Sequence, residues 1–265
     1  QFLNTRKQET GYDVLLICKR CTSTVLEKCY QDGINVLDFA GNCLISANGI
    51  YVNIQGKKAN MPIPTNDKTF NEAGIKLVYF FLYDKENISK SYREIAQDTG
   101  LSLGTITNVI NELMANKFVS TSGKKRIIIN REVLIEQWQQ TYNRVLKPKL
   151  FIGKMKFMSK EAARNWREIA LPDNSVWGGE SGANIIDGYL QPEIFSIYTD
   201  KTMSALLATR NMAPAPDGQI YVYKKFWPIK DNATTTARLI IYADLMGSGN
   251  SRCLEAAQRI KQNGL

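Results

Sequence analysis

The chain has 265 residues, of which 44% are hydrophobic and 22% are charged, a composition that indicates a folded globular protein and excludes a disordered chain. Its formal net charge of +9 favours an anionic partner, either a nucleic acid or an anionic membrane surface. No apolar run approaches the ~18 residues that cross a bilayer, and no signal-peptide pattern opens the sequence. We therefore expect a cytoplasmic protein with no membrane partner. Because the first residue is Gln1 rather than Met, we also expect that preceding residues are missing.

Residues 1–64 are expected to form a small α/β unit. An apolar run predicts a strand over residues 12–19, and a helix is predicted over residues 23–31, with Ser23 or Thr22 as its N-cap. Three short strands are predicted next, separated by two glycine-containing turns. They cover residues 34–39, 43–46 and 51–55.

Four of the five cysteines lie in this unit, and the odd total argues against a disulfide framework. The Cys18-x-x-Cys21 spacing could begin a four-sulfur zinc site completed by Cys29 and Cys43. Cys18, however, ends an apolar run that predicts a buried strand, and Cys29 falls within the predicted helix. These positions favour buried free thiols, Cys253 included, so we predict no metal site.

One alternative function is that of a nuclease. Asp38 on a predicted strand, followed by Gln55-Gly56-Lys57, resembles the arrangement of restriction-endonuclease-like nucleases, in which two acidic groups hold Mg²⁺ and a lysine helps to activate water. Here the second acidic position is Gln55, whose amide oxygen is a weaker magnesium ligand than a carboxylate. Three hypotheses stay open: a nuclease using Asp38 and Lys57, an inactive relative of that fold, or a turn shaped by Asp38 and Asn42 beside a solvated Lys57.

Residues 65–146 are predicted to form a winged helix-turn-helix DNA-binding domain. A polar stretch with two prolines, residues 57–68, is expected to be a linker. Residues 70–83 are strongly apolar with helical spacing, which predicts a helix before the helix-turn-helix.

The helix-turn-helix is predicted from its capping residues. Ser91 can cap a helix, and Glu94 three residues later completes a capping box. Ile95 would face inward. Gly100 supplies the left-handed conformation that ends the first helix sharply, and Ser102 caps the second helix.

The second helix is predicted to have an apolar face and a polar face. Spacings of three and four place four apolar side chains on the inner face, namely Leu103, Ile106, Ile110 and Leu113. The opposite face carries short side chains, namely Gly104, Thr105, Asn108 and Asn111. Such a face suits the major groove, where asparagine can pair with adenine edges.

Residues 118–129 are predicted to form the wing, a hairpin with its turn at Ser122-Gly123. Three cations follow the turn and could reach phosphates or the minor groove. Because the second helix has no Lys or Arg before Lys117, most of the affinity would come from the wing and Arg93. The candidate DNA-binding residues are Ser91, Arg93, Ser102, Gly104, Thr105, Asn108, Asn111, Lys124, Lys125 and Arg126.

Residues 147–265 are expected to form an α/β domain that senses or interacts. Strands are predicted over residues 150–157, 194–198 and 220–226, and helices over residues 160–169, 182–190, 202–211, 238–246 and 252–261. The segment Trp177-Gly-Gly-Glu-Ser-Gly lacks the lysine of a phosphate loop. We therefore interpret it as a turn that opens a helix, with Trp177 in the core.

Two further features of this domain bear on function. The chain has no histidine, so a Ser-His hydrolase is excluded. Residues 221–227 alternate aromatic and cationic side chains, which could stack single-stranded nucleic acid. An edge strand with one buried face explains the same pattern and is the favoured interpretation.

Several segments, taken in order, resemble the AbiEi-type antitoxin family, transcriptional regulators of type IV toxin–antitoxin systems. The segments are residues 33–42, 91–96, 103–107, 147–150, 177–180, 188–193, 242–245 and 252–257. The resemblance runs from about Tyr12 to the C-terminus. It implies a bacterial regulator that represses its own operon and opposes a nucleotidyltransferase-like toxin without binding it stably. The chain departs from the best-described relatives in that an α/β unit precedes the winged helix.

We therefore predict a mixed α/β fold in which a central winged helix-turn-helix is flanked by an N-terminal α/β unit and a C-terminal α/β domain. Under one of the hypotheses above, the N-terminal unit has a restriction-endonuclease-like fold but is inactive. The predicted function is sequence-specific binding of double-stranded operator DNA in transcriptional control, without enzymatic activity or a cofactor. A homodimer is expected for a palindromic operator. The alternatives are the magnesium-dependent nuclease and a winged-helix scaffold that binds protein.

Overall fold

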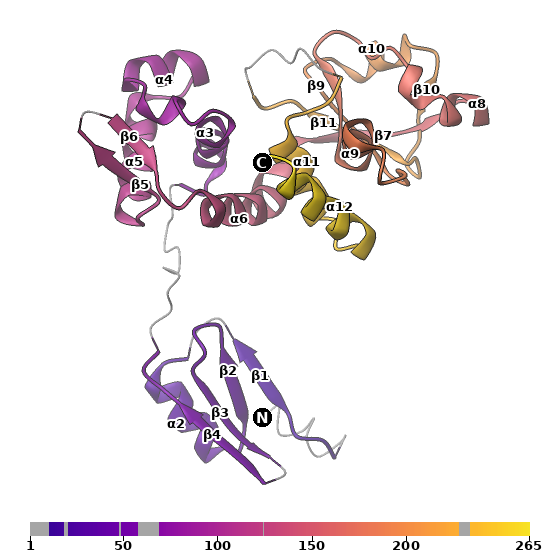
Figure 1. Cartoon of the computed structure of the whole chain (residues 1–265). Helices are drawn as coiled ribbons and strands as arrows, with labels where there is room; N and C mark the ends of the chain where they lie inside the picture. The colour runs from indigo at the N-terminus through magenta and orange to yellow at the C-terminus, as the bar shows by residue number, and fades with distance from the viewer. Residues whose placement is uncertain (1–10, 19–20, 48, 58–68, 124, 228–233) are drawn as a thin grey trace. The chain divides into compact units, whose positions relative to one another are not determined.

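The computed structural model describes residues 11–18, 21–47, 49–57, 69–123, 125–227 and 234–265 (Figure 1). The chain divides into two compact units, Gln1–Asn66 and Asp67–Leu265. The fold is mixed α/β, as predicted. Within the described part of the chain, no helix is both long enough and apolar enough to cross a membrane.

The first unit is a four-stranded sheet with one helix, and it follows the predicted strand–helix–strand order with ends shifted by a few residues. Strands β1 to β4 lie side by side in chain order; β1 is parallel to β2, and the remaining pairs are antiparallel. Thr22 is the N-cap of the helix, because its side chain accepts a hydrogen bond from the Val25 N–H. The elements are β1 (Leu15–Cys18), α2 (Ser23–Gln31), β2 (Asn35–Asp38), β3 (Cys43–Ala47) and β4 (Ile50–Ile54).

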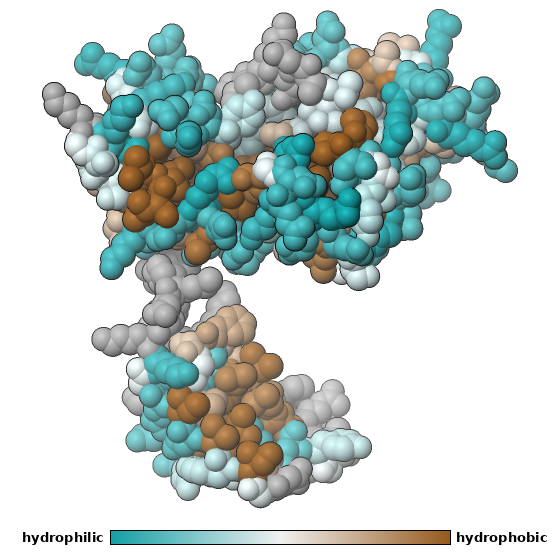
Figure 2. Space-filling model, in the orientation of Figure 1, coloured by the Kyte–Doolittle hydropathy of each residue, from teal (hydrophilic) through white to brown (hydrophobic). Residues whose placement is uncertain are grey.

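Strand β1 is not buried on both faces, which corrects the prediction. Leu15 is 44% exposed and Ile17 is 59% exposed. Helix α2 covers the other face, where Leu26 packs with Val36 and Leu44. A continuous apolar run predicts cover on both faces, whereas α2 supplies cover on one. Figure 2 shows hydrophobic residues gathered on the surface of this unit, over its strands.

The second unit begins with helices and a short hairpin. Helices α3, α4, α5 and α6 share one apolar core with the later helices α11 and α12, and β5 pairs antiparallel with β6. The elements are α3 (Glu72–Tyr83), the 3₁₀ turn η1 (Asn87–Ser89), α4 (Tyr92–Thr99), α5 (Leu103–Ala115), β5 (Val119–Ser122), β6 (Lys125–Ile128) and α6 (Arg131–Thr141).

The hairpin turn lies one residue later than predicted. Ser122 pairs with Lys125, so Ser122 is the last residue of β5 and the turn begins at Gly123, whose φ is 62°. Lys124 lies outside the described residues. The positive φ of Gly123 suits glycine, which adopts it without a steric penalty.

A five-stranded sheet forms the rest of the second unit. Its order is β10-β7-β11-β9-β8; β9 and β11 are parallel, and the other pairs are antiparallel. A single-turn π-helix, η2 (Tyr142–Leu146), and α7 (Lys147–Leu150) lead into it. The strands are β7 (Phe151–Phe157), β8 (Ser175–Gly178), β9 (Phe195–Thr199), β10 (Met212–Pro214) and β11 (Ile220–Lys224), and the helices are α8 (Lys160–Arg164), the 3₁₀ turn η3 (Trp166–Glu168), α9 (Gly179–Asp187), α10 (Met203–Leu207), α11 (Arg238–Met246) and α12 (Ser251–Gln262).

The sheet corrects several predictions. Strand β11 lies in the middle of the sheet, so the expected edge strand is wrong. The helix predicted over residues 160–169 is broken into α8 and η3, and the helix predicted over residues 202–211 ends at Leu207. Strands β8 and β10 and helix α6 were not predicted. Short strands of three or four residues have too few positions to show a period of two, and tertiary pairing defines them instead.

Candidate nucleic-acid interface

Helix α4 begins with the predicted capping box. The Glu94 N–H donates to Ser91 Oγ at 3.3 Å, and the Ser91 N–H donates to Glu94 Oε2 at 2.8 Å. The hydrogen bonds from Ser91 hold the pKa of Glu94 below its usual range, because they stabilise the carboxylate. Ser91 is therefore committed to the start of the helix.

The turn between α4 and α5 also follows the prediction. Gly100 has a φ of 70°, and its N–H donates to the Ala96 carbonyl at 2.8 Å. Ser102 caps α5, since its Oγ accepts the Thr105 N–H at 3.2 Å and lies 2.9 Å from Thr105 Oγ1. The hydroxyl groups of Ser102 and Thr105 thus bind each other and the first turn of the helix.

The inner face of α5 differs from the prediction at one position. Ile106, Ile110 and Leu113 are buried as expected, and Val109 is buried with them. Leu103 is 48% exposed and is therefore not a core residue. It is the first residue of the helix, so it lies at the edge of the core that covers the following turns.

The outer face of α5 brings three predicted residues together. Gly104, Asn108 and Asn111 are exposed at spacings of four and three, on one side of the helix. A Cβ placed at Gly104 would meet no atom within 4 Å, so the backbone there is open to close approach. This face therefore presents two side-chain amides beside a stretch of accessible backbone.

Arg126 makes local contacts that were not predicted. Its Nε donates to the Ile88 carbonyl at 2.8 Å, its Nη2 donates to the Lys90 carbonyl at 2.5 Å, and its guanidinium lies 4.9 Å from the ring centroid of Tyr92. Arg126 thereby ties strand β6 to the segment before α4. The alternation along β6 could have revealed this, because Arg126 shares the inward side with Ile128 while Lys125 points outward.

The cations around the helix pair fall into two groups. Lys90 Nζ lies 2.8 Å from Asp98 Oδ2 and 5.3 Å from the ring centroid of Phe80, so its charge is already paired. Arg93 on α4 and Lys125 on the hairpin are exposed, and neither has an ion-pair partner among the residues that the structure describes. These two side chains, together with Lys117, which is exposed just after the end of α5, are described cations that can meet an external anion here.

Asp38 shapes a turn in the first unit. Its carboxylate accepts the N–H groups of Cys21, Ala40 and Asn42 at 2.8–2.9 Å and the Asn42 side-chain amide at 2.9 Å. Burial raises the pKa of Asp38, but the hydrogen bonds from Cys21 and Asn42 outweigh it and hold the pKa below the usual value. With its oxygen atoms committed in this way, Asp38 fits the turn-shaping hypothesis better than the magnesium-binding one.

The other parts of the nuclease pattern are also engaged locally. The Asn42 side chain exchanges two hydrogen bonds with the backbone of Lys57, whose own side chain is exposed. Gln55 Nε2 donates to Asn53 Oδ1 at 3.0 Å. Across the described ranges, no three His, Cys, Asp or Glu side chains gather as they would around a metal ion.

The five cysteines are free thiols, as predicted. Cys21, Cys29, Cys43 and Cys253 are buried, and Cys18, whose Sγ lies 3.1 Å from Cys21 Sγ, is half-buried. Burial raises the pKa of Cys21 to about 12. This burial favours the neutral thiol of Cys21 over its thiolate.

The segment around Trp177 packs closely against strand β9. Trp177 lies in the core, as predicted. A Cβ at Gly178 would come within 2.7 Å of the Tyr198 ring, and a Cβ at Gly179, where φ is 51°, would come within 2.8 Å of Ser196 Oγ. Glycine at both positions therefore allows β8 to turn directly into α9, which begins three residues before the predicted helix.

A buried polar cluster that the sequence does not predict surrounds Asp244 on α11. Asp244 on α11 accepts hydrogen bonds from the Tyr198 and Tyr142 hydroxyl groups at 2.9 and 3.3 Å, and its Oδ1 lies 2.8 Å from Lys147 Nζ. The two hydroxyl groups lie 2.7 Å apart. Burial and the neighbouring Asp244 carboxylate raise the pKa values of both tyrosines. We call these residues, with the Gly179 N–H that donates to Asp244 Oδ2, the Asp244 cluster.

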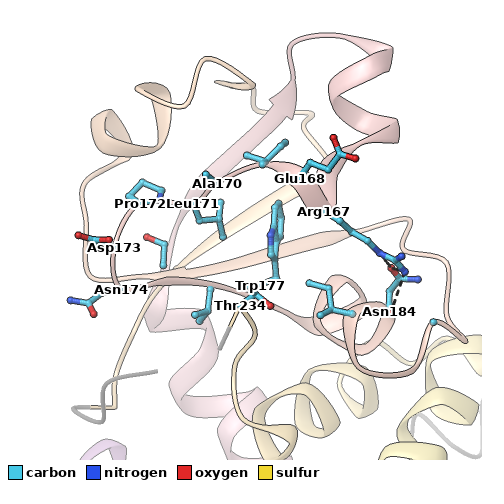
Figure 3. A pocket seen from close by; sticks show the side chains of 15 residues that line it. Arg167, Glu168, Ala170, Leu171, Pro172, Asp173, Asn174, Trp177, Asn184 and Thr234 are labelled. Carbon is cyan, nitrogen blue, oxygen red and sulfur yellow. Dashed lines mark hydrogen bonds between the residues drawn. The ribbon is translucent and has the colours of Figure 1, made fainter. Parts of the chain in front are cut away.

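A large cavity lies on the other side of the sheet (Figure 3). It measures about 700 Å³ and is lined by the segment before β8 and by one side of α9. Arg167 crosses its wall and donates to Asn184 Oδ1 from Nε at 2.9 Å and from Nη2 at 2.5 Å. Trp177 forms another part of the wall, so the cavity opens beside the apolar cluster that contains this side chain.

Comparison with known protein families supplies a match. The family model described as "Transcriptional regulator, AbiEi antitoxin, Type IV TA system" matches residues 126–265, more than half of the chain. The matched region begins inside β6 and includes the Asp244 cluster, whereas helices α4 and α5 precede it. No curated protein and no solved structure matches the chain.

Proposed function

Because the chain belongs to the AbiEi family of antitoxin transcriptional regulators of type IV toxin–antitoxin systems, we propose that residues 69–128 form a winged helix-turn-helix module that binds double-stranded DNA. The observation that carries the proposal is the outer face of α5. There Gly104, Asn108 and Asn111 are exposed together, on a helix whose opposite face is buried. Family membership alone does not supply this element, since the match begins at residue 126.

In this proposal α5 enters the major groove. Asn108 and Asn111 read base edges, and Gly104 lets the backbone approach the groove closely. Arg93 and Lys125 contact phosphates, as does Lys124, which lies outside the described residues. Ser91, Ser102 and Thr105 hold the ends of the two helices, and Arg126 anchors the wing.

The regulatory role extends this proposal. The chain would repress its own operon and oppose a nucleotidyltransferase-like toxin indirectly, without enzymatic activity or a cofactor. It would act in the cytoplasm. A palindromic operator would require two copies of α5 about one helical turn of DNA apart, ~34 Å, and hence a homodimer.

The test is duplex binding measured by fluorescence anisotropy. The probes are a duplex covering the protein's own upstream region and a scrambled duplex of equal length, each at two salt concentrations. We expect Asn108→Ala to cost roughly 1–3 kcal/mol of discrimination between the two probes. Lys125→Ala should weaken binding to both and reduce the salt slope by about 0.9.

Lys160→Ala serves as the matched control, because Lys160 is exposed on α8 in the C-terminal domain. Equal affinity for the native and scrambled duplexes, or equal losses in Lys125→Ala and Lys160→Ala, would overturn the proposed interface. An affinity that does not change with salt would favour a protein-binding scaffold instead. Cleavage of the duplex with Mg²⁺, abolished in Asp38→Ala, would favour the nuclease hypothesis.

A further inference from the structure

The five-stranded sheet has two unlike faces. Ile220 and Val222 of β11 point into the apolar cluster with Trp177 and are fully buried. Tyr221 and Tyr223 alternate to the second face and are only half-buried. Over β8 and β9 this second face is covered by α9 and α11, whose side chains pack with Tyr198 and its neighbours. Over β7 and β11 it remains partly open.

Three aromatic rings lie together on the open part. Phe151, which is 44% exposed, has its ring centroid 6.1 Å from that of Tyr221 and 5.8 Å from that of Tyr223. Tyr223 also stacks on the buried ring of Tyr198, with the two ring centroids 5.2 Å apart, and this contact holds the Tyr223 ring in place. We call Phe151, Tyr221 and Tyr223 the tyrosine face. Rings held in this way are suited to stacking planar groups.

Lysine side chains border the tyrosine face. Lys154 pairs with Tyr221 across the two strands, and its Nζ lies 4.5 Å from the centre of that ring. Lys156, two residues on, shares its face of β7 and is exposed. Neither lysine has a carboxylate partner among the residues that the structure describes. The border of the face is therefore cationic.

A small cavity opens at the inner end of this face. It measures about 180 Å³ and is lined by Tyr221, Tyr223, Lys147, Ser196 and Ser248 among others. At roughly 30 Å³ per water it holds about six water molecules, enough for one planar base but too little for a whole nucleotide. A base in it would lie against the tyrosine rings.

The acidic groups that line the cavity are already paired. Asp244 lies 2.8 Å from Lys147 Nζ, and Glu180 lies 2.9 Å from Arg252 Nη2. They therefore add little repulsion toward a phosphate, and Lys154 and Lys156 leave the surroundings positively charged. Charge and rings together match a ligand that carries both phosphates and planar bases.

We infer that the tyrosine face binds single-stranded nucleic acid, with one base in the small cavity against Tyr221 and Tyr223, a second stacked on the exposed ring of Phe151, and the phosphates beside Lys154 and Lys156. This site is separate from the duplex interface proposed on α5. A purely acidic peptide would use the lysines and leave the rings unused, so the rings favour the nucleic acid.

The test is anisotropy with labelled single-stranded oligomers of about twelve nucleotides, one of RNA and one of DNA, and with a duplex of the same sequence. The variants are Tyr221→Leu, which keeps an apolar side chain on the strand, and Lys154→Ala. Matched controls are Tyr30→Leu and Lys28→Ala, the same residue types exposed on α2 of the first unit. We expect the wild type to bind at least one single strand, and both site variants to lose about tenfold in affinity.

Several outcomes separate this inference from the duplex interface. Lys125→Ala should keep its single-strand affinity, and Tyr221→Leu should keep its duplex affinity. The RNA and DNA arms identify which sugar the site accepts. If Tyr221→Leu fails to fold, as judged by circular dichroism, Lys154→Ala and Lys156→Ala carry the test.

The inference is overturned if the wild type binds neither single strand, or if the controls lose as much as the site variants. Complete competition by an acidic peptide, with no loss in Tyr221→Leu, would also overturn it. In that case the surface recognises charge alone.

Discussion

In the helix pair α4–α5, the polar groups at the helix ends find their partners three or four residues away along the chain. Ser91 bonds with Glu94, Gly100 with Ala96, and Ser102 with Thr105. In the Asp244 cluster, the hydrogen-bonding partners are 46 to 102 residues apart. Both regions satisfy their polar groups, but over very different lengths of chain.

The difference has energetic consequences. A local cap forms together with its helix and stays close to water, so its loss costs little. A buried cluster forms only when distant segments are already in place, and each of its members becomes an unsatisfied buried group when a partner is removed. We therefore expect substitutions in the Asp244 cluster to destabilise the protein most.

The largest effect is expected for Asp244→Ala. It would leave the Lys147 ammonium, whose side chain is only 19% exposed, without its carboxylate, and one of the two tyrosine hydroxyl groups without an acceptor, since the other can still donate to its neighbour. We expect a loss of about 3–5 kcal/mol in the free energy of unfolding, measured by urea denaturation. The control is Asp98→Ala, which removes an exposed ion pair with Lys90 and should cost about 1 kcal/mol or less. Similar losses in the two variants would contradict the comparison.

A second test compares two apolar side chains one turn apart on α5. Ile106→Ala should cost about 2–5 kcal/mol, because the side chain is fully buried. Leu103→Ala should cost about 1 kcal/mol or less, since Leu103 is half-exposed. Thermal denaturation of both variants checks the corrected core, and an equal fall in Tm would show that Leu103 is buried after all.

Two glycines in the helix pair should respond with opposite signs. Gly100→Ala should destabilise by about 1–2 kcal/mol, because φ is 70° and an alanine there is strained although the space is open. Gly104→Ala should stabilise by about 0.4–1 kcal/mol, because Gly104 is in the first turn of α5 with open space around it and alanine restricts the unfolded chain. Urea denaturation gives both signs, and a destabilised Gly104→Ala would mean that this face of α5 is covered.

A small effect is expected at the N-cap of α4. Ser91→Ala should cost about 1 kcal/mol, since one helix-terminal N–H loses its acceptor. Ser91→Asp should restore most of the stability, because aspartate is an equally good cap. Unfolding curves at neutral pH measure both changes.

The same capping box predicts a pH dependence. The pKa of Glu94 is lower in the folded protein than its ordinary value, so its contribution to stability is present above the ordinary pKa and is lost as the pH falls through the folded-state pKa. Glu94→Gln should remove this part of the acid sensitivity. An unchanged stability-against-pH curve in Glu94→Gln would show that the capping box contributes none of it.

The features that could be predicted from the sequence are the ones that depend on local hydrogen bonds, and those that depend on distant segments could not be predicted. The caps at Ser91 and Ser102, the left-handed Gly100 and the outer face of α5 were all predicted, because neighbouring residues decide them. The hydrogen bonds of Arg126 were not predicted, since its partners, Ile88 and Lys90, lie more than 30 residues away. The Asp244 cluster was not predicted at all.

Local chemistry alone therefore specified where the helices of the pair begin and end and which of their faces is polar. Tertiary structure decided that β11 lies in the middle of its sheet and that one apolar face of β1 stays exposed. It also decided that Tyr221 lies on the partly open face of the sheet. The reason is physical. Capping hydrogen bonds span three or four residues, whereas the position of a strand and the cover on its faces depend on segments that only the folded chain brings together.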